Sequence, residues 1–266
     1  MKCKFLKASL AGLILSASCL FNIANAGLLY GIDRTDDSLV TVDLGTFSAT
    51  TVGSLGTNEN FGGLAYSVNS SIMYMAGGRS NNSIYTVDYL TGTASLLGAH
   101  GIGDVFGLAF DSANNVLYGT TTTSELYSFS LTDGSATLIG NTGFNIGGLS
   151  YNSNLDLLIG MSTGGGTIFD IDRITGAAAI VMSGLPSTND VGFTYDYDAD
   201  IFYSLGLNGT LHSYSSTDYT SSLLASGLPD IDGLTYVGDS VRVPEPSILA
   251  IFALGMIGLA SRRFKR

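Results

Sequence analysis

The middle of the chain alternates short apolar runs with polar turns rich in glycine, serine, asparagine and aspartate, and it shows no sustained helical spacing. Within this pattern a four-residue motif, Gly-apolar-small-aromatic, recurs five times. The copies occupy residues 63–66, 107–110, 148–151, 192–195 and 233–236, so their glycines lie 44, 41, 44 and 41 positions apart. A period of about 42 residues is typical of β-propellers, whose repeating unit is a blade of four strands.

Three further strands complete each unit. The second strand lies 11 positions after the motif glycine, beyond a polar turn that indicates a hairpin, at Tyr74, Tyr118, Ile159 and Tyr203. The third strand alternates polar and apolar residues, as a half-buried strand does, over 39–43, 84–88, 126–130, 168–172 and 211–215. The fourth strand is expected around Leu96, Leu138, Ile180 and Leu223.

The two ends of this region complete one another. The first part supplies three strands, near Tyr30, Val40 and Val52, and the last part supplies one, at 233–237. Together they make one blade. The sequence therefore predicts an all-β fold, a five-bladed β-propeller of about 20 strands whose closing blade is shared by N- and C-terminal strands. Ring closure covers strand edges that would otherwise pair with other chains.

The first 26 residues have the order of a secretory signal peptide. Three lysines within the first seven residues precede an apolar stretch over 8–21. Ala24 and Ala26 then supply the small side chains that signal peptidase requires before Gly27. We expect residues 1–26 to be removed after export through the Sec machinery.

Both cysteines of the chain, Cys3 and Cys19, lie within this predicted signal peptide. Lipidation of Cys19 is an alternative to cleavage after Ala26, but Ser16 stands where a lipobox requires leucine. After cleavage the mature protein has no disulfide, no thiol nucleophile and no cysteine metal site.

The C-terminal end combines three elements: Pro244-Glu245-Pro246, an apolar run over 248–260, and a basic ending that includes Arg262 and Arg263. In this order they resemble the PEP-CTERM sorting signal of Gram-negative bacteria. The prolines favour an extended, accessible peptide before the apolar run. A helix over 247–261 would be about 22 Å long, against roughly 30 Å of hydrocarbon, so we expect a short transmembrane helix that anchors the chain transiently.

The resemblance implies that an exosortase cuts the chain near Pro244 to Pro246 and passes the protein from the inner membrane to the cell surface, the outer membrane or the extracellular space. The chain then divides into a signal peptide (1–26), a propeller domain (27–243) and a sorting signal (244–266). The basic residues set the orientation of the tail, with the C-terminus on the cytoplasmic side and everything upstream outside. The alternative is an ordinary single-span tail that keeps the domain in the inner membrane.

Residues 27–243 hold four arginines, no lysine and 21 acidic residues, which gives a formal net charge of −17. A surface of this charge repels nucleic acid and anionic lipid headgroups. It favours solubility outside the cell and permits weak binding of divalent cations. The absence of lysine excludes Schiff-base chemistry and a phosphate-binding P-loop from this region.

Candidate catalytic groups are few. His212 occupies a third-strand position that is apolar or aromatic in the other units, so we expect it to pack within the sheet. His100 lies in a glycine-rich connection between blades and is expected to be a loop residue. Because no nucleophile motif accompanies either histidine, a Ser-His-Asp triad has little support.

Asp196, Asp198 and Asp200 alternate as the first carboxylates of a calcium loop do. The segment lacks the glycine and the late glutamate of an EF-hand, and it falls where every other unit has its hairpin turn. A solvated turn is the main interpretation. Calcium, the one cofactor that the sequence suggests, is the alternative.

These features predict an exported, non-enzymatic surface or extracellular-matrix protein that binds exopolysaccharide, other envelope proteins or divalent cations. One alternative is a metal-dependent hydrolase or lactonase that uses the central channel, which would need several carboxylate or asparagine ligands on the axis. Another alternative is a binding module that its tail anchors permanently.

Overall fold

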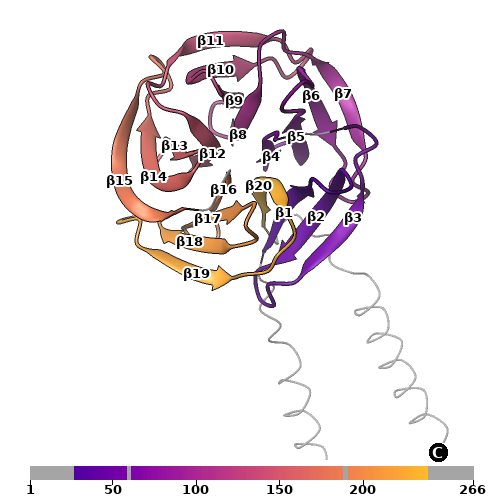
Figure 1. Cartoon of the computed structure of the whole chain (residues 1–266). Helices are drawn as coiled ribbons and strands as arrows, with labels where there is room; N and C mark the ends of the chain where they lie inside the picture. Colours follow the sequence, from indigo (N-terminus) through magenta and orange to yellow (C-terminus); the bar gives the residue numbers. More distant parts are fainter. Residues whose placement is uncertain (1–26, 59–60, 188–190, 239–266) are drawn as a thin grey trace, which may run out of the picture.

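The computed structural model describes residues 27–58, 61–187 and 191–238. Twenty strands in these residues form five four-stranded sheets, arranged as blades around a central axis (Figure 1). The all-β, five-bladed propeller predicted from the repeat is confirmed. The predicted signal peptide and sorting signal lie outside the described residues, within which no helix is long and apolar enough to span a membrane.

Four blades are continuous in sequence, and each runs outward from its innermost strand. The first consists of β4 (Leu64–Ser67), β5 (Ile72–Ala76), β6 (Ser83–Val87) and β7 (Ala94–Ala99), and the second of β8 (Val105–Asp111), β9 (Val116–Thr121), β10 (Glu125–Phe129) and β11 (Ala136–Asn141). The third consists of β12 (Ile146–Asn152), β13 (Leu157–Ser162), β14 (Gly165–Ile171) and β15 (Ala178–Ser187). The fourth consists of β16 (Val191–Asp196), β17 (Ile201–Gly206), β18 (Leu211–Ser215) and β19 (Ser221–Ala225). The fifth blade joins β20 (Ile231–Val237) to β1 (Leu28–Asp33), β2 (Ser38–Asp43) and β3 (Ala49–Ser54).

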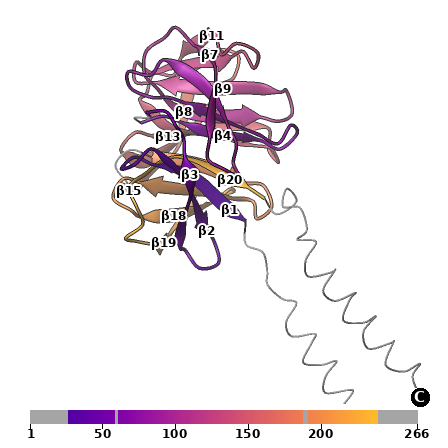
Figure 2. The ribbon, with the colours of Figure 1, turned by 90° about the vertical axis from the view of Figure 1, so that its right-hand side faces the viewer.

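The ring closes through the antiparallel pair of β1 and β20. Leu28 is the partner of Val237 in this pair, and a register shift beside Gly31 interrupts it near its middle. Because Leu28 faces Val237, the first and last described residues, Gly27 and Gly238, lie at the same end of the disc (Figure 2). The shared closing blade predicted from the sequence is confirmed.

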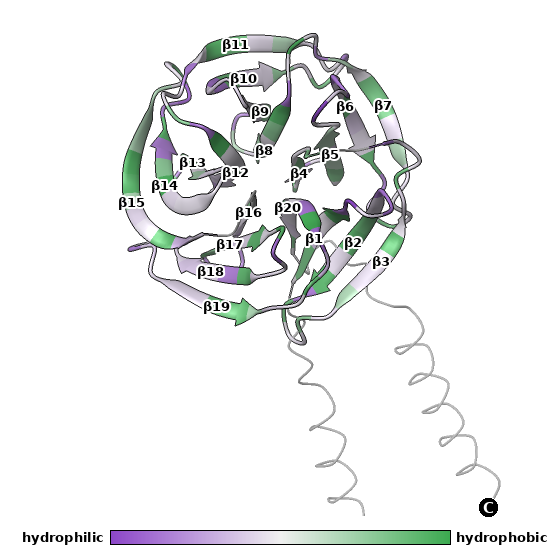
Figure 3. Cartoon of the chain, in the orientation of Figure 1, coloured by the Kyte–Doolittle hydropathy of each residue, from purple (hydrophilic) through white to green (hydrophobic). Residues whose placement is uncertain are grey.

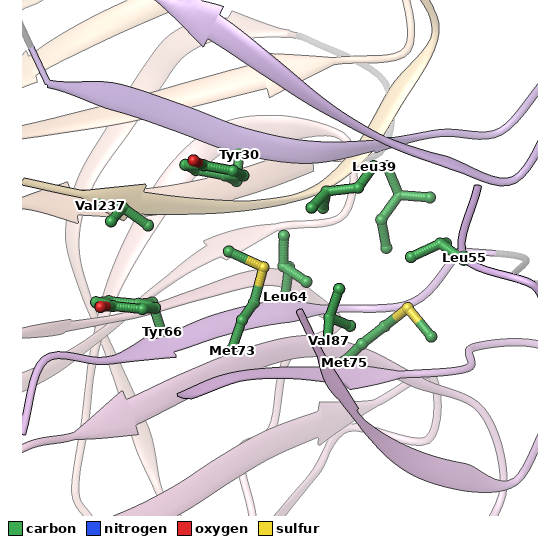
Figure 4. Packing of buried hydrophobic residues seen from close by; sticks show 10 residues of the cluster. Tyr30, Leu39, Leu55, Leu64, Tyr66, Met73, Met75, Val87 and Val237 are labelled. Carbon is green, nitrogen blue, oxygen red and sulfur yellow. The ribbon is translucent and has the colours of Figure 1, made fainter. Parts of the chain in front are cut away.

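Apolar side chains fill the gaps between neighbouring blades. Five clusters of buried residues form this core, one in each gap. Beside the closing blade, Tyr30 and Leu39 face Leu64, Met73 and Met75 of the next blade (Figure 4). Since every cluster draws on two blades, no blade can bury its apolar faces alone.

Each outer strand carries an irregularity at the same place. A register shift occurs in all five pairs between the third and fourth strands of a blade. Such a bulge bends the strand and raises its local twist, which curves the outer strands around the rim. The residues predicted to mark the fourth strands are exposed on this rim, where Figure 3 shows hydrophobic bands: Leu96, Leu138, Ile180 and Leu223.

The packing of the inner strands explains why each copy of the motif begins with glycine. A Cβ added to Gly63 would lie 2.6 Å from the Cβ of Leu108 and 2.6 Å from the carbonyl oxygen of Phe106. Gly107 and Gly192 likewise face a leucine of the next inner strand. The motif glycine therefore allows adjacent inner strands to approach closely around the axis.

Gly63→Ala should destabilise the protein by about 1 to 3 kcal/mol, because backbone atoms of the next inner strand oppose the added methyl group. The matched control is Gly103→Ala, since a Cβ there meets no atom within 4 Å. Urea unfolding followed by far-UV circular dichroism measures the free energy of unfolding of both variants. Equal stabilities would show that the motif glycine is not needed for strand approach.

Candidate functional site

The five inner strands surround a cavity of about 310 Å³ at one end of the axis. Two or three consecutive residues from each of β4, β8, β12, β16 and β20 line it, together with residues of the turns that follow. The aromatic residue of each motif copy belongs to the wall: Tyr66, Phe110, Tyr151, Tyr195 and Tyr236. Among the described residues the lining contains no charged side chain. Aromatic, aliphatic, hydroxyl and amide residues therefore line the site.

Two of these tyrosines fasten the turns that follow their strands. The Tyr151 hydroxyl donates to Asp156 at 2.7 Å, and the Tyr195 hydroxyl donates to Asp200, five positions on in both cases. Both aspartates have φ near 58°, a left-handed conformation that is uncommon outside glycine. Accepting the tyrosine bond lowers the pKa of Asp200, while burial and the carboxylate raise the pKa of Tyr195. These two hydrogen bonds hold the tyrosine side chains against the turns at the cavity mouth.

The aspartates of the candidate calcium loop have separate structural roles. Buried Asp196 accepts the backbone N–H groups of Asp198 and Ala199 at 2.9 and 2.8 Å, and burial raises its pKa. Asp198 accepts the Tyr236 hydroxyl at 2.9 Å, and Asp200 accepts the tyrosine bond described above. The described part of the chain contains no group of three or more His, Cys, Asp or Glu side chains able to hold a metal ion. These hydrogen bonds are those of a hairpin turn and its contact with Tyr236, and the calcium alternative stays a prediction.

Arg173, in the turn between β14 and β15, links two neighbouring blades. Its Nη1 lies 2.5 Å from Oδ2 of Asp111, whose side chain is fully buried, and its Nη2 lies 2.8 Å from Oδ1 of Asp156. The guanidinium also lies over the Tyr151 ring, 5.6 Å from its centroid. Arg173 lowers the pKa of Asp156 and keeps this carboxyl ionised. No local sequence pattern indicates this role for Arg173, since Asp111 is 62 positions away.

The two histidines lie away from the cavity lining. His212 is buried in β18 between Ser204 of β17 and Leu223 of β19, which confirms its role as a packed strand residue. His100 follows β7 in a connection between blades, as expected, but it is only 4% exposed and its ring meets Phe129 edge-on at 5.8 Å. Burial lowers the pKa of His100 to about 4.

Residues 242–266 match the family model described as the PEP-CTERM protein-sorting motif. The chain carries a PEP-CTERM sorting motif. The resemblance found in the sequence is therefore confirmed, and the match begins two residues before the predicted boundary at Pro244. The motif implies an exported protein that an exosortase recognises and processes at the membrane.

Comparison with solved structures shows the fold alone. One chain of a nidogen/laminin complex is similar with a TM-score of 0.55 and 12% identity, over 81% of this chain and 82% of that one. A structural-genomics protein of unknown function from Bacteroides thetaiotaomicron VPI-5482 is similar with a TM-score of 0.56 and 19% identity, over 78% of this chain and 56% of that one. The present chain thus spans little more than half of the Bacteroides protein. No curated protein matches the sequence.

His100 should make stability depend on pH. Because its folded pKa of about 4 lies below the ordinary value of 6.5, the unfolded state binds the proton more readily below pH 6.5. Because of His100, we expect the free energy of unfolding to fall by about 2 kcal/mol when the pH is lowered from 7 to 5. Urea unfolding at both pH values measures this loss, which His100→Gln should lack and the control His212→Gln should keep. The same loss in His100→Gln as in the wild type would contradict the assignment.

Arg173→Met should destabilise the protein by about 3 kcal/mol, because it leaves the fully buried carboxylate of Asp111 without its cation. The double variant Asp111→Asn/Arg173→Met removes the uncompensated charge and should regain most of this loss. Chemical denaturation of both variants at pH 7 measures the difference. If the double variant were no more stable than Arg173→Met, Arg173 would stabilise the protein through packing of its aliphatic stem rather than through charge pairing with Asp111.

Proposed function

We propose that this chain is a non-enzymatic envelope protein: an exosortase sorts it, and its acidic five-bladed disc binds a partner at the cell surface or in the extracellular matrix. The observation that carries the proposal is the sorting motif over 242–266, which begins shortly after the closing strand β20 ends at Val237. A folded domain joined to such a motif is a cargo for delivery outside the cell.

The chemistry of the cavity supports binding rather than catalysis. The described residues that line it carry no charged side chain, and the carboxylates near its mouth are engaged: Asp198 and Asp200 accept tyrosine hydroxyls, and Asp156 pairs with Arg173. Both histidines are buried away from the wall. A hydrolase or lactonase that used the channel would instead need a general base or a ligand set converging on the axis.

The architecture also supports processing of a folded substrate. The pairing of β20 with β1 ends at Val237, and residues 238–241 separate it from the sorting motif. An enzyme that acts near Pro244 to Pro246 need not break any hydrogen bond of the closing blade. Sorting and folding are therefore separable properties of this chain.

The sorting proposal is tested by replacing Pro244, Glu245 and Pro246 with alanine in a host that contains an exosortase. Mass spectrometry should show that the wild-type protein in the outer fraction ends between Val243 and Pro246. The variant should keep Arg266 and stay in the inner membrane, because the extended recognition peptide is lost.

Pro229→Ala, a proline substitution within the disc, is the matched control and should be processed normally. If the wild type also keeps Arg266 in the inner membrane, the protein is a permanently anchored binding module. Turnover of an envelope substrate by the purified protein would contradict the non-enzymatic part of the proposal and favour the hydrolase or lactonase alternative.

A further inference from the structure

The wall of the axial cavity is built largely from backbone. Consecutive residues of an inner strand line it, such as Leu64, Ala65 and Tyr66 of β4. Successive side chains of a strand point to opposite faces, so three neighbours share one wall only if the strand presents its edge to the cavity. Each inner strand pairs with a single neighbour within the described residues, which leaves that edge free.

The hydrogen-bond register shows which backbone groups this free edge presents. The Gly63 carbonyl accepts the N–H of Ala76 at 3.0 Å, so these two residues form a hydrogen-bonded pair. One position on, Leu64 faces Met75 in a pair without mutual hydrogen bonds. The N–H and C=O groups of Leu64, and of Tyr66 two positions later, therefore point away from β5 toward the axis.

The closing blade shows the same arrangement independently. The backbone N–H of Tyr236 points away from β1 and donates to Thr194 Oγ1 of the neighbouring inner strand at 3.0 Å. Since the motif repeats in all five inner strands, we infer that the matching positions of the other inner strands also turn their N–H and C=O groups toward the axis, where Thr194 already occupies the N–H of Tyr236. Backbone groups in such a place need hydrogen-bond partners, which water or a ligand can supply.

The composition of the wall selects the class of ligand. No charged side chain lines the cavity in the described part of the chain, and carboxylates of Asp156, Asp198 and Asp200 stand around its mouth. These carboxylates repel anions. They are already engaged with tyrosine hydroxyls or arginine, which makes them poor partners for a cation. A neutral molecule rich in hydroxyl groups matches a wall of donors and acceptors, because each hydroxyl both donates and accepts.

We propose that the axial cavity binds a neutral sugar unit, held by backbone N–H and C=O groups of the five inner strands and flanked by the motif aromatics. A volume of about 310 Å³ lies at the lower end of the range for small-molecule sites, which suits one or two sugar rings. This inference rests on the proposed function and names the chemical class of its partner. The cavity mouth is at the end of the disc where Gly238 donates to the Tyr197 hydroxyl, so the sugar would bind beside the start of the tail.

The test uses the full chain, purified in an amine-oxide detergent because that detergent carries no sugar headgroup. Calorimetric titrations use neutral tetrasaccharides of glucose, galactose, mannose and N-acetylglucosamine, with tetragalacturonate as the anionic probe and a chitosan tetramer as the cationic probe. Tyrosine emission gives a second signal, since the chain has 14 tyrosines and no tryptophan. Five tyrosines line the cavity, so binding there should change the emission.

Ser112→Leu/Ser153→Leu narrows the mouth, because both serines line the cavity in the turns after β8 and β12. It should weaken binding of the neutral tetrasaccharide at least tenfold. The matched control, Ser95→Leu/Ser222→Leu, makes the same chemical change at exposed positions of outer strands β7 and β19 and should change binding less than twofold. Melting temperatures of both double variants show whether each is folded.

Failure of every neutral tetrasaccharide to bind would overturn the proposal, as would equal weakening by the two double variants or preferential binding of a charged probe. None of these outcomes affects the sorting assay, which reports on the proposed function separately. Hydrolysis of a bound tetrasaccharide would support the cavity as the sugar site and would contradict only the proposed non-enzymatic role.

Discussion

The pairing of β20 with β1 is the constraint on which the rest of the structure depends. Every apolar cluster lies between two blades, so the last gap is filled only if the end of the domain returns to its beginning. Without this pair, β20 would leave the ring of inner strands, and the cavity would lose one fifth of its wall. The pair joins residues about 200 positions apart, so forming it costs loop-closure entropy. Burial of apolar side chains in the two clusters beside the closing blade must offset this cost.

The same pair determines the relation between the disc and its sorting motif. An inner strand ends beside the axis, and β20 is the inner strand from which the chain continues toward residue 242. The described part of the chain therefore ends on the side of the disc that holds the cavity mouth, where the N–H of Gly238 donates to the Tyr197 hydroxyl. A ring closed by its outermost strand would instead release the tail at the rim. The choice of closing strand thus places Gly238, the last described residue, beside the cavity rather than at the rim.

Much of this fold could be predicted from the sequence because the repeat is local: the motif, the hairpin turn and the alternating strand recur within about 42 residues. The motif glycine lies where adjacent inner strands approach closely, so it recurs once in every repeat and can be found from the period alone. The site could not be predicted in the same way. Arg173 reaches Asp111 across a gap between blades, and Asp198 accepts the hydroxyl of Tyr236. Among the residues that the structure describes, neither contact repeats in the other blades. His100 was expected in a loop, but its burial depends on packing against Phe129.

The acidic composition has a local explanation that also bears on binding. Several aspartates end a strand or directly follow one and accept backbone N–H groups of the turn, as Asp43, Asp88 and Asp172 do. These bonds lower the pKa of Asp88 and Asp172, so the turns carry full negative charge at neutral pH. With four arginines in residues 27–243, most of this charge is uncompensated. Turn formation thus gives the disc a negative field that disfavours anions, while the described residues that line the cavity have hydrogen-bonding and aromatic groups but no charged side chain.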